Sequence, residues 1–216
     1  METAALASIA LLAIRGQRLG LILPQPTAWR DLYGLRSARL ELPATPHASG
    51  ADPQEEALAL SETFYGRAAP PLPTRWTYGS SPRHMVDRFP VAEAALATPF
   101  LRIERVAPPD ADTGQAPRQT AIEVYRASLD GDATLDARKA GALLWLPVGA
   151  LRQVAGGAPL SDLLAMEDMR VELPLGARLP DDALIYLPSE YGERFLLRIA
   201  AKYGEGALFA ASSLGT

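Results

Sequence analysis

Three glutamates in one predicted helix are the residues of this sequence best placed to do chemistry. Glu55, Glu56 and Glu62 fall within residues 52–66, and Glu55 and Glu62 are seven positions apart, on one helix face. Carboxylates on one face are the hard oxygen ligands that Mg²⁺ and Ca²⁺ prefer. Acidic residues near a helix start also favour the helix dipole and solubility without forming any site. The alternatives are therefore a displaced metal site and a solvated helix face.

Other residues of suitable type lack the spacing that a site requires. Two pairs of acids lie in predicted loops, namely Asp110 and Asp112, and Asp130 and Asp132. The Asp-Gly-Asp order of the second pair is typical of a turn and lacks the remaining ligands of a calcium loop. His47 and His84 are the two histidines, and they have no close metal-binding spacing. The sequence also lacks a serine nucleophile elbow, a phosphate-binding glycine loop and a dinucleotide-binding fingerprint.

The helix that carries the three glutamates has start and stop signals at both ends. Asp52 can accept hydrogen bonds from the free N–H groups of the first turn, and Pro53 suits the first helical position. Glu55 completes the spacing of a capping box, and Gly66 suits the position after the last turn. These signals predict a helix over residues 52–66.

Hydrophobic patterning predicts strands on both sides of this helix. Gly16-Gln17 joins the first two apolar runs, which indicates a hairpin. The predicted strands cover 7–15, 18–24, 38–42, 100–106, 120–127 and 142–147, with short extended pieces at 171–173 and 183–187. Further helices are predicted at 91–97, 148–154, 160–165 and 189–203, with an exposed loop at 108–118. This order predicts an α/β (α+β) fold with one sheet flanked by helices.

The segment around the predicted helix resembles the Nudix hydrolases. Their box runs glycine, five residues, glutamate, seven residues, Arg-Glu, an aliphatic residue, one residue, Glu-Glu, one residue and glycine, after a strand that ends in Leu-Pro. Here Leu40-Glu41-Leu42-Pro43 occupies the strand end, Gly50-Ala51-Asp52-Pro53 matches a frequent start of the box helix, and Gly66 falls at the closing glycine. The alternative is a capped amphipathic helix of an unrelated α+β domain.

The resemblance covers roughly residues 5–155, and Leu144-Trp145-Leu146-Pro147 is similar to the end of many Nudix domains. It implies a Nudix-like α/β/α sandwich with a mixed sheet and a C-terminal helical extension. We therefore expect a Nudix-like domain at 1–155 and an extension at 156–216 that packs on it and is not an independent domain.

The box lacks the carboxylates of the family. The first glycine of the box falls on Thr45, the first glutamate on Ala51, the Arg-Glu pair on Ala59 and Leu60, and the final Glu-Glu on Thr63 and Phe64. In the family these carboxylates hold Mg²⁺ against a diphosphate. Leu60 and Phe64 instead continue an apolar stripe, so we expect both to be buried. The prediction is no catalytic residue, no metal and no cofactor, with Mg²⁺ at Glu55, Glu56 or Glu62 as the alternative.

Residues near the box are candidates for ligand binding by the same resemblance. In Nudix proteins this part of the chain contributes to the ligand cleft, where an aromatic ring can stack on a base and arginines can bind phosphate. The candidate ligand-binding residues are Trp29, Arg36, Arg39, Glu41 and His47. Surface arginines, a packed tryptophan and a surface histidine explain the same residues without a ligand.

Composition restricts the partners. The formal net charge is −4, which gives no reason to expect a nucleic-acid partner. The apolar run over residues 4–14 is too short to span a bilayer, which takes about 20 residues, so we expect no membrane association and a cytoplasmic location. Cysteine is absent from the sequence, which excludes disulfides and thiolate sites. Two lysines, Lys139 and Lys202, accompany many arginines, which indicates composition bias before phosphate recognition.

Together these observations favour a non-catalytic Nudix-fold protein that binds a nucleotide-like ligand or acts as a structural or regulatory partner. The alternative is a divalent-metal-dependent hydrolase of nucleoside diphosphate derivatives with a relocated acidic site. A regulator with a DNA-binding winged helix is disfavoured because the acidic tail after Gly157 shows one long helix. That helix, at 189–203, should cover a hydrophobic surface, and a homodimer is expected if the surface belongs to a second copy.

Overall fold

The computed structural model describes residues 5–32, 34–80, 86–91, 98–107, 118–180, 183–187 and 193–210. The strands are β1 (Ala5–Arg15), β2 (Arg18–Leu23), β3 (Arg30–Leu32), β4 (Leu35–Arg39), β5 (Ala44–Pro46), β6 (Trp76–Ser80), β7 (Val86–Pro90), β8 (Leu101–Ala107), β9 (Arg118–Ser128), β10 (Ala142–Leu146), β11 (Ala158–Pro159), β12 (Arg170–Glu172) and β13 (Leu184–Tyr186). The α-helices are α1 (Pro53–Tyr65), α2 (Val148–Gly156), α3 (Leu160–Leu164), α4 (Glu193–Tyr203) and α5 (Gly206–Phe209), and a 3-10 turn, η1, covers Pro26–Ala28.

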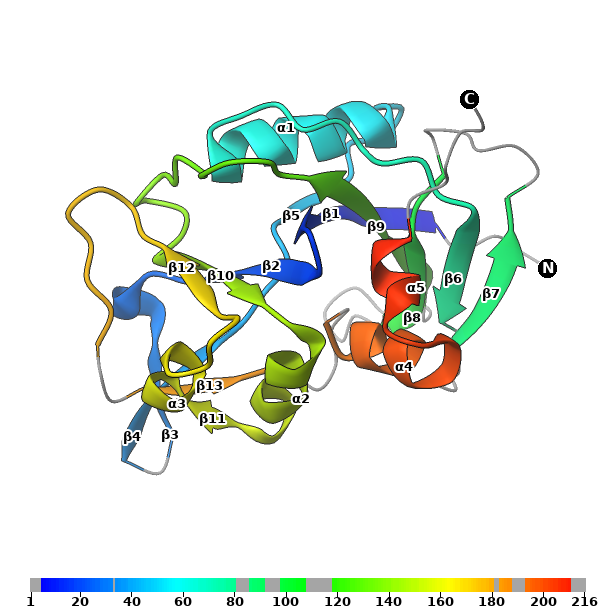
Figure 1. The fold of residues 1–216 in the computed structure, drawn as a ribbon. Helices are drawn as coiled ribbons and strands as arrows, with labels where there is room; N and C mark the ends of the chain where they lie inside the picture. Colours follow the sequence, from blue (N-terminus) through cyan, green and yellow to red (C-terminus); the bar gives the residue numbers. More distant parts are fainter. Residues whose placement is uncertain are drawn as a thin grey trace.

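A mixed sheet forms the centre of the molecule. Within the described residues it has nine strands, in the order β12-β10-β2-β1-β9-β8-β6-β7, with β5 paired to β1. Strand β1 runs antiparallel to β2 and β5 and parallel to β9. Helix α1 covers one face of this sheet, and α2 and α4 lie on the other (Figure 1). The predicted α+β class with a mixed sheet and several helices is confirmed.

The prediction of a single sheet is wrong. A second sheet of four strands, in the order β11-β13-β4-β3, forms within the described residues. Strand β4 covers Leu35–Arg39, three residues earlier than the predicted strand 38–42, and it pairs in parallel with β13, with Leu184 opposite Ser37. These partners are almost 150 residues apart in the sequence, so local patterning could not reveal the pairing.

Helix α1 forms as its end signals predict. The Asp52 side chain accepts a hydrogen bond from the Gln54 N–H at 2.8 Å, and Pro53 opens the first turn. Gly66 ends the helix with φ 67°, a left-handed conformation that glycine adopts without a steric penalty. A Cβ at Gly66 would also lie 2.6 Å from the carbonyl oxygen of Thr134. Glycine at this position therefore allows the left-handed helix end and also leaves room for the neighbouring loop at Thr134.

Two hydrophobic clusters lie on opposite faces of the sheet. Alternate residues of β1 divide between them, because successive strand side chains point to opposite faces. Ile9 and Leu11 pack with Leu60 and Tyr65 of α1, whereas Leu12 packs on the side of α2 and α4. Strand β1 therefore reads as a continuous apolar run, as expected for a strand covered on both faces.

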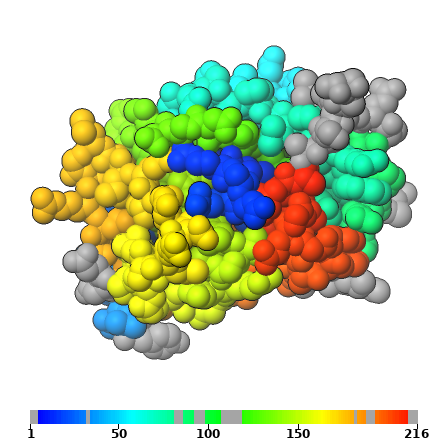
Figure 2. All heavy atoms as spheres, in the orientation of Figure 1, coloured from blue at the N-terminus to red at the C-terminus, as the bar shows by residue number. Residues whose placement is uncertain are grey.

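The C-terminal helices pack on their own chain. Phe195, Leu196 and Ile199 of α4 are buried in the larger cluster, which confirms the predicted helix and its hydrophobic role over the described part of 189–203. Figure 2 shows these helices in red against the blue N-terminal hairpin. The surface that α4 covers therefore belongs to the same chain. The part of the chain that the structure describes contains no helix long and apolar enough to cross a membrane.

Two buried charged side chains fasten the C-terminal segment to the sheet. Arg126 of β9 donates to the carbonyl oxygens of Leu208 and Ala210 at 3.0 and 2.8 Å, and burial lowers its pKa to about 10. The Glu193 carboxylate accepts a hydrogen bond from the Leu42 N–H at 2.9 Å, and burial raises its pKa. The sequence alone singles out neither residue, because the partners of each are distant in the chain.

Some predictions fall on residues whose structure is not described. Most of the predicted helix 91–97 and of the predicted loop 108–118 lies outside the described residues, as do His84, Asp110 and Asp112. Several short elements had no signal strong enough to predict, among them β3, β5, β6, β7, β11 and α5. Each of these spans five residues or fewer, so pairing and packing with distant segments decide their conformation more than local patterning does.

Candidate ligand pocket over helix α1

A pocket of about 460 Å³ opens beside helix α1. Its lining comes from β5, α1 and the turn before β10, and consists of Ala44, Thr45, Glu56, Ala59, Leu60, Thr63, Phe64 and Lys139. Strand β5 is held on β1 by the pairing of Ser8 with Pro46. Strand β5 of the main sheet and helix α1 therefore form two walls of the pocket. Its volume lies in the range of small-molecule sites, roughly 300–1,000 Å³.

The pocket lies over the segment whose sequence resembles the Nudix box. In that resemblance five lining residues, Thr45, Ala59, Leu60, Thr63 and Phe64, align with box positions, and four of them align with the Arg-Glu and Glu-Glu pairs. These four side chains carry methyl groups, a phenyl ring and a hydroxyl. The pocket wall on this side is consequently apolar.

Leu60 and Phe64 differ in burial, which corrects part of the sequence prediction. Leu60 is buried, with 4% of its surface exposed, and it forms the floor of the pocket. Phe64 was expected to be buried as well, but it is only partly buried and packs at the edge of the smaller cluster. Because α1 turns one side of the ring toward the pocket, Phe64 serves as a wall with an accessible face.

Glu56 lies in the pocket lining, but its carboxylate is engaged by the preceding loop. The Glu56 Oε2 lies 2.6 Å from His47 Nδ1, and its Oε1 accepts the Ala48 N–H at 2.9 Å. Burial raises the pKa of Glu56, but the hydrogen bonds from Ala48 and His47 outweigh burial and leave the pKa below its usual value. His47 therefore anchors the loop to α1, a contact that the sequence did not predict.

The acids of the pocket region do not fit a magnesium ion. Glu55 and Glu62 are exposed on α1 and do not line the pocket, and both oxygens of Glu56 already have partners. Mg²⁺ requires near-octahedral oxygen coordination, in which one or two carboxylates act together with phosphates and water. Across the residues that the structure describes, no group of three or more histidines and acids is arranged to hold a metal ion.

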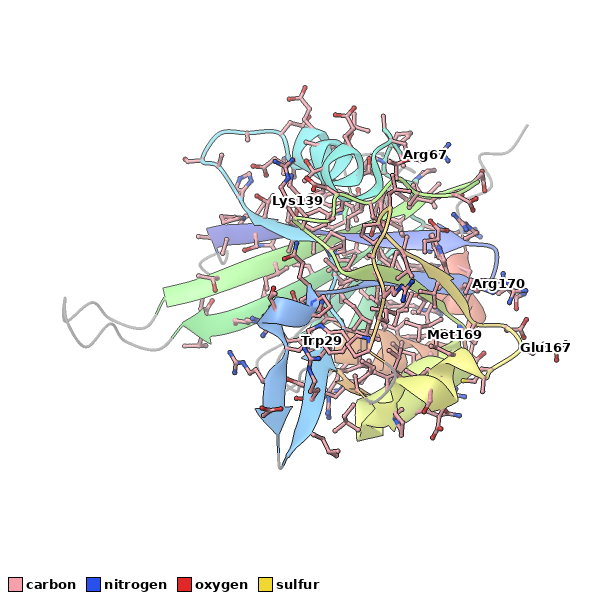
Figure 3. All side chains as sticks on the ribbon, turned by 90° about the vertical axis from the view of Figure 1, so that its left-hand side faces the viewer. Trp29, Arg67, Lys139, Glu167, Met169 and Arg170 are labelled. Carbon is pink, nitrogen blue, oxygen red and sulfur yellow. The ribbon has the colours of Figure 1, made fainter. Side chains whose placement is uncertain are left out.

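Lys139 contributes the positive charge of the pocket. Its backbone is fixed by a turn, in which the Lys139 N–H donates to the Asp136 carbonyl at 2.9 Å. The Asp136 carboxylate is bound by Arg138, whose Nε and NH2 donate to its two oxygens at 3.2 and 3.0 Å. Lys139 extends its Nζ to 6.0 Å from the Phe64 ring centre, the outer limit of a cation–π contact. Figure 3 shows Lys139 beneath α1.

The other predicted ligand-binding residues lie around a second, smaller pocket. Arg39 and Glu41 form an ion pair and line a pocket of about 230 Å³, together with Tyr186, Arg30 and Ser37 among others. Arg36 lies over Trp29, with its guanidinium carbon 5.8 Å from the ring centre, and the Trp29 Nε1–H donates to Pro24. The structure therefore brings Arg39 and Glu41 to one pocket and Arg36 onto Trp29 outside its lining, and it places His47 against Glu56 of α1.

The two pockets are neighbours along the chain. Glu41 lines the smaller pocket and Ala44 the larger one, so three residue steps of at most about 10 Å connect them. The Gln25 side chain also donates to the carbonyl of Ala137, which joins the turn of Lys139 to the segment that leads to Trp29. In Figure 3 Lys139 lies between α1 and Trp29.

Sequence reasoning missed Lys139, although the sequence held a signal for it. In a chain whose cations are nearly all arginine, a lysine is the exception, and only Lys139 and Lys202 break the pattern. The loop acids Asp130 and Asp132 remain exposed, with Asp132 lying 3.8 Å from Arg15. They do not line the pocket over α1.

Comparison with known proteins shows a similarity of fold to solved structures. No family model matches the sequence, and a search of curated proteins gives no match. A Nudix hydrolase from Nitrosomonas europaea aligns with 12% identity and a TM-score of 0.39, over 68% of this chain and 76% of that one. A MutT Nudix hydrolase from Burkholderia pseudomallei has 17% identity and a TM-score of 0.35, over 68% and 86%. The Nudix domain of Shewanella oneidensis NrtR, complexed with ADP ribose, has 14% identity and a TM-score of 0.33, over 70% and 79%. The likeness concerns the fold alone.

Proposed function

We propose that this protein is a non-catalytic Nudix-fold protein that binds a small, nucleotide-like molecule in the pocket over α1. The observation that supports it most directly is a pocket whose lining includes Ala59, Leu60, Thr63 and Phe64, the residues that align with the acidic pairs in the resemblance to the Nudix box. None of these four residues carries a carboxylate. Binding is therefore the function that the residues present can still perform.

The lining favours a ligand with a flat apolar part and hydrogen-bond acceptors. The exposed side of Phe64 offers a stacking surface, and base–aromatic stacking contributes about 1–3 kcal/mol. The Thr45 and Thr63 hydroxyls and the Lys139 ammonium are the side-chain donors of the lining. We place Trp29, Arg36, Arg39 and Glu41 at the far end of the same ligand surface.

The same residues argue against hydrolysis. A diphosphate hydrolase of this type needs a metal ion to offset phosphate charge and to activate water. Glu56 is the acid of the pocket lining, and its two oxygens are bound to His47 and Ala48. Without the ligands for such an ion, the expected loss of rate is many orders of magnitude.

A paired assay of turnover and binding tests this proposal. Purified protein is incubated with ADP-ribose, dinucleoside polyphosphates or nucleoside triphosphates, each with Mg²⁺ and with Mn²⁺. We expect no turnover above a control without protein, and calorimetric titration should detect binding for some of these compounds. Ala59→Trp should abolish that binding by filling the pocket, whereas Ala68→Trp, at an exposed position outside the lining, should not.

The alternative hydrolase makes the opposite prediction. Metal-dependent turnover that disappears in Glu55→Gln, Glu56→Gln or Glu62→Gln protein would establish a relocated acidic site and refute a purely binding role. If none of the compounds binds, a structural or regulatory partner role replaces ligand binding. A homodimer is expected only for the structural or regulatory partner role, and light scattering of the full chain tests it. Helix α4 packs within its own chain, so a dimer would have to use another surface.

A further inference from the structure

We propose that the Lys139 ammonium takes the place of a metal ion in this pocket, so that the protein binds an anion attached to a flat apolar group without any divalent cation. This inference rests on the proposed function, because it concerns the ligand of the same pocket. It assigns the ligand class more narrowly, as a small molecule with one anionic group and one aromatic ring system.

The charge of Lys139 is available to a ligand. Arg138 occupies both oxygens of Asp136, which is the nearest acid along the chain. Among the residues that the structure describes, no carboxylate lies within ion-pair distance of the Lys139 Nζ. An exposed ammonium on a flexible stem can reach an anion in the adjacent pocket.

The remaining charge in the lining does not oppose an anion strongly. Glu56 directs one oxygen to His47 and the other to the Ala48 N–H, so its negative charge is partly compensated on the loop side. The hydroxyls of Thr45 and Thr63 add hydrogen-bond donors to the same lining. A donor-rich pocket with one cation matches one anionic group.

The apolar lining determines the rest of the ligand. Phe64 lies 6.0 Å from the Lys139 Nζ, so a ring stacked on Phe64 would place its substituents within reach of the ammonium. The volume of about 460 Å³ is in the lower half of the usual range for small-molecule sites, which favours one ring system with one anionic group over a dinucleotide.

Adenosine 5′-monophosphate and adenosine form a matched pair of probes, because they differ only in the phosphate. Calorimetric titrations are carried out on the full chain in EDTA and in Mg²⁺. We expect the monophosphate to bind equally well in both, and Lys139→Met to weaken it about tenfold while leaving adenosine unchanged. Lys139→Arg should restore most of the affinity. Lys202→Met is the matched control, since Lys202 is paired with Asp87 away from the pocket.

Other outcomes overturn the inference. If Lys139→Met leaves the affinity for the monophosphate unchanged, or if binding requires Mg²⁺, Lys139 does not replace a metal. Ala59→Trp then tests the proposed function separately. If this substitution still abolishes binding, the ligand binds in the pocket over α1, even though Lys139 does not replace a metal. If neither probe binds to the unaltered protein, the assigned ligand class is wrong. Thermal melts of each variant verify that the substitutions leave the fold intact.

Discussion

Truncation of Phe64 to alanine tests whether its ring is a wall of the pocket or part of the hydrophobic core. A fully buried phenylalanine costs about 3–5 kcal/mol on truncation, and a fully buried leucine costs about 2–5 kcal/mol. Phe64 is only partly buried, and the space left by its ring would open to the pocket and fill with water. We therefore expect Phe64→Ala to lower the free energy of unfolding by only about 1–2 kcal/mol, because no closed cavity forms.

Leu60→Ala is the matched control, because Leu60 is one turn earlier on the same helix and is 4% exposed. We expect it to cost about 3 kcal/mol. Urea unfolding followed by tryptophan fluorescence resolves the two, since an m-value of about 2–3 kcal/mol per molar gives midpoint shifts of roughly 0.5 M for Phe64→Ala and 1 M or more for Leu60→Ala. In the binding assay, Phe64→Ala should lose about tenfold in affinity because the stacking surface is missing.

The stability losses of Phe64→Ala and Leu60→Ala, compared with each other, show whether Phe64 is a pocket wall or a core residue. If Phe64→Ala destabilises the protein more than Leu60→Ala, the ring is a core residue in solution and the pocket is closed. An unchanged affinity for a ligand that Ala59→Trp excludes would show that Phe64 does not touch the ligand. Either result would remove the structural basis for the proposed function.

Three further predictions concern stability. Tyr65 is fully buried, and its hydroxyl has no hydrogen-bond partner among the described residues. Tyr65→Phe should therefore stabilise the protein by about 1 kcal/mol, a rise of roughly 2–4 °C in melting temperature, and a lower melting temperature would contradict this. Burial raises the pKa of Glu193 above its unfolded value, so the stability that it contributes is complete below about pH 4 and is lost as the pH rises through its folded pKa. The stability of Glu193→Gln relative to the unaltered protein should therefore increase as the pH rises from 4 to 7 in urea titrations, and a difference that is constant with pH would refute the explanation. Residues 156–216 supply β12 to the main sheet and α4 to the core, so we expect a chain of residues 1–155 to remain unfolded by circular dichroism, and a cooperative melt of that chain would make it an independent domain.

The local signals in the sequence were sufficient for the elements whose ends carry their own chemistry. Asp52, Pro53 and Gly66 specify α1 from within a single stretch of chain, because caps act on backbone groups a few residues away. The turn Gly16-Gln17 specified the first hairpin for the same reason. The absence of carboxylates at Ala59, Leu60, Thr63 and Phe64 was also readable from the sequence alone, since it depends only on residue types.

Tertiary structure alone decided which side chains line the pocket over α1. Lys139 reaches the pocket from a turn more than 70 residues after Phe64, and the availability of its charge depends on Arg138 occupying Asp136. The same holds for Glu56, whose burial and hydrogen bonds to the loop remove it from metal binding. Sequence spacing describes neighbours within one element, whereas the burial of a ring, the pairing of a charge and the walls of a pocket are set by segments that meet only when the sheet assembles.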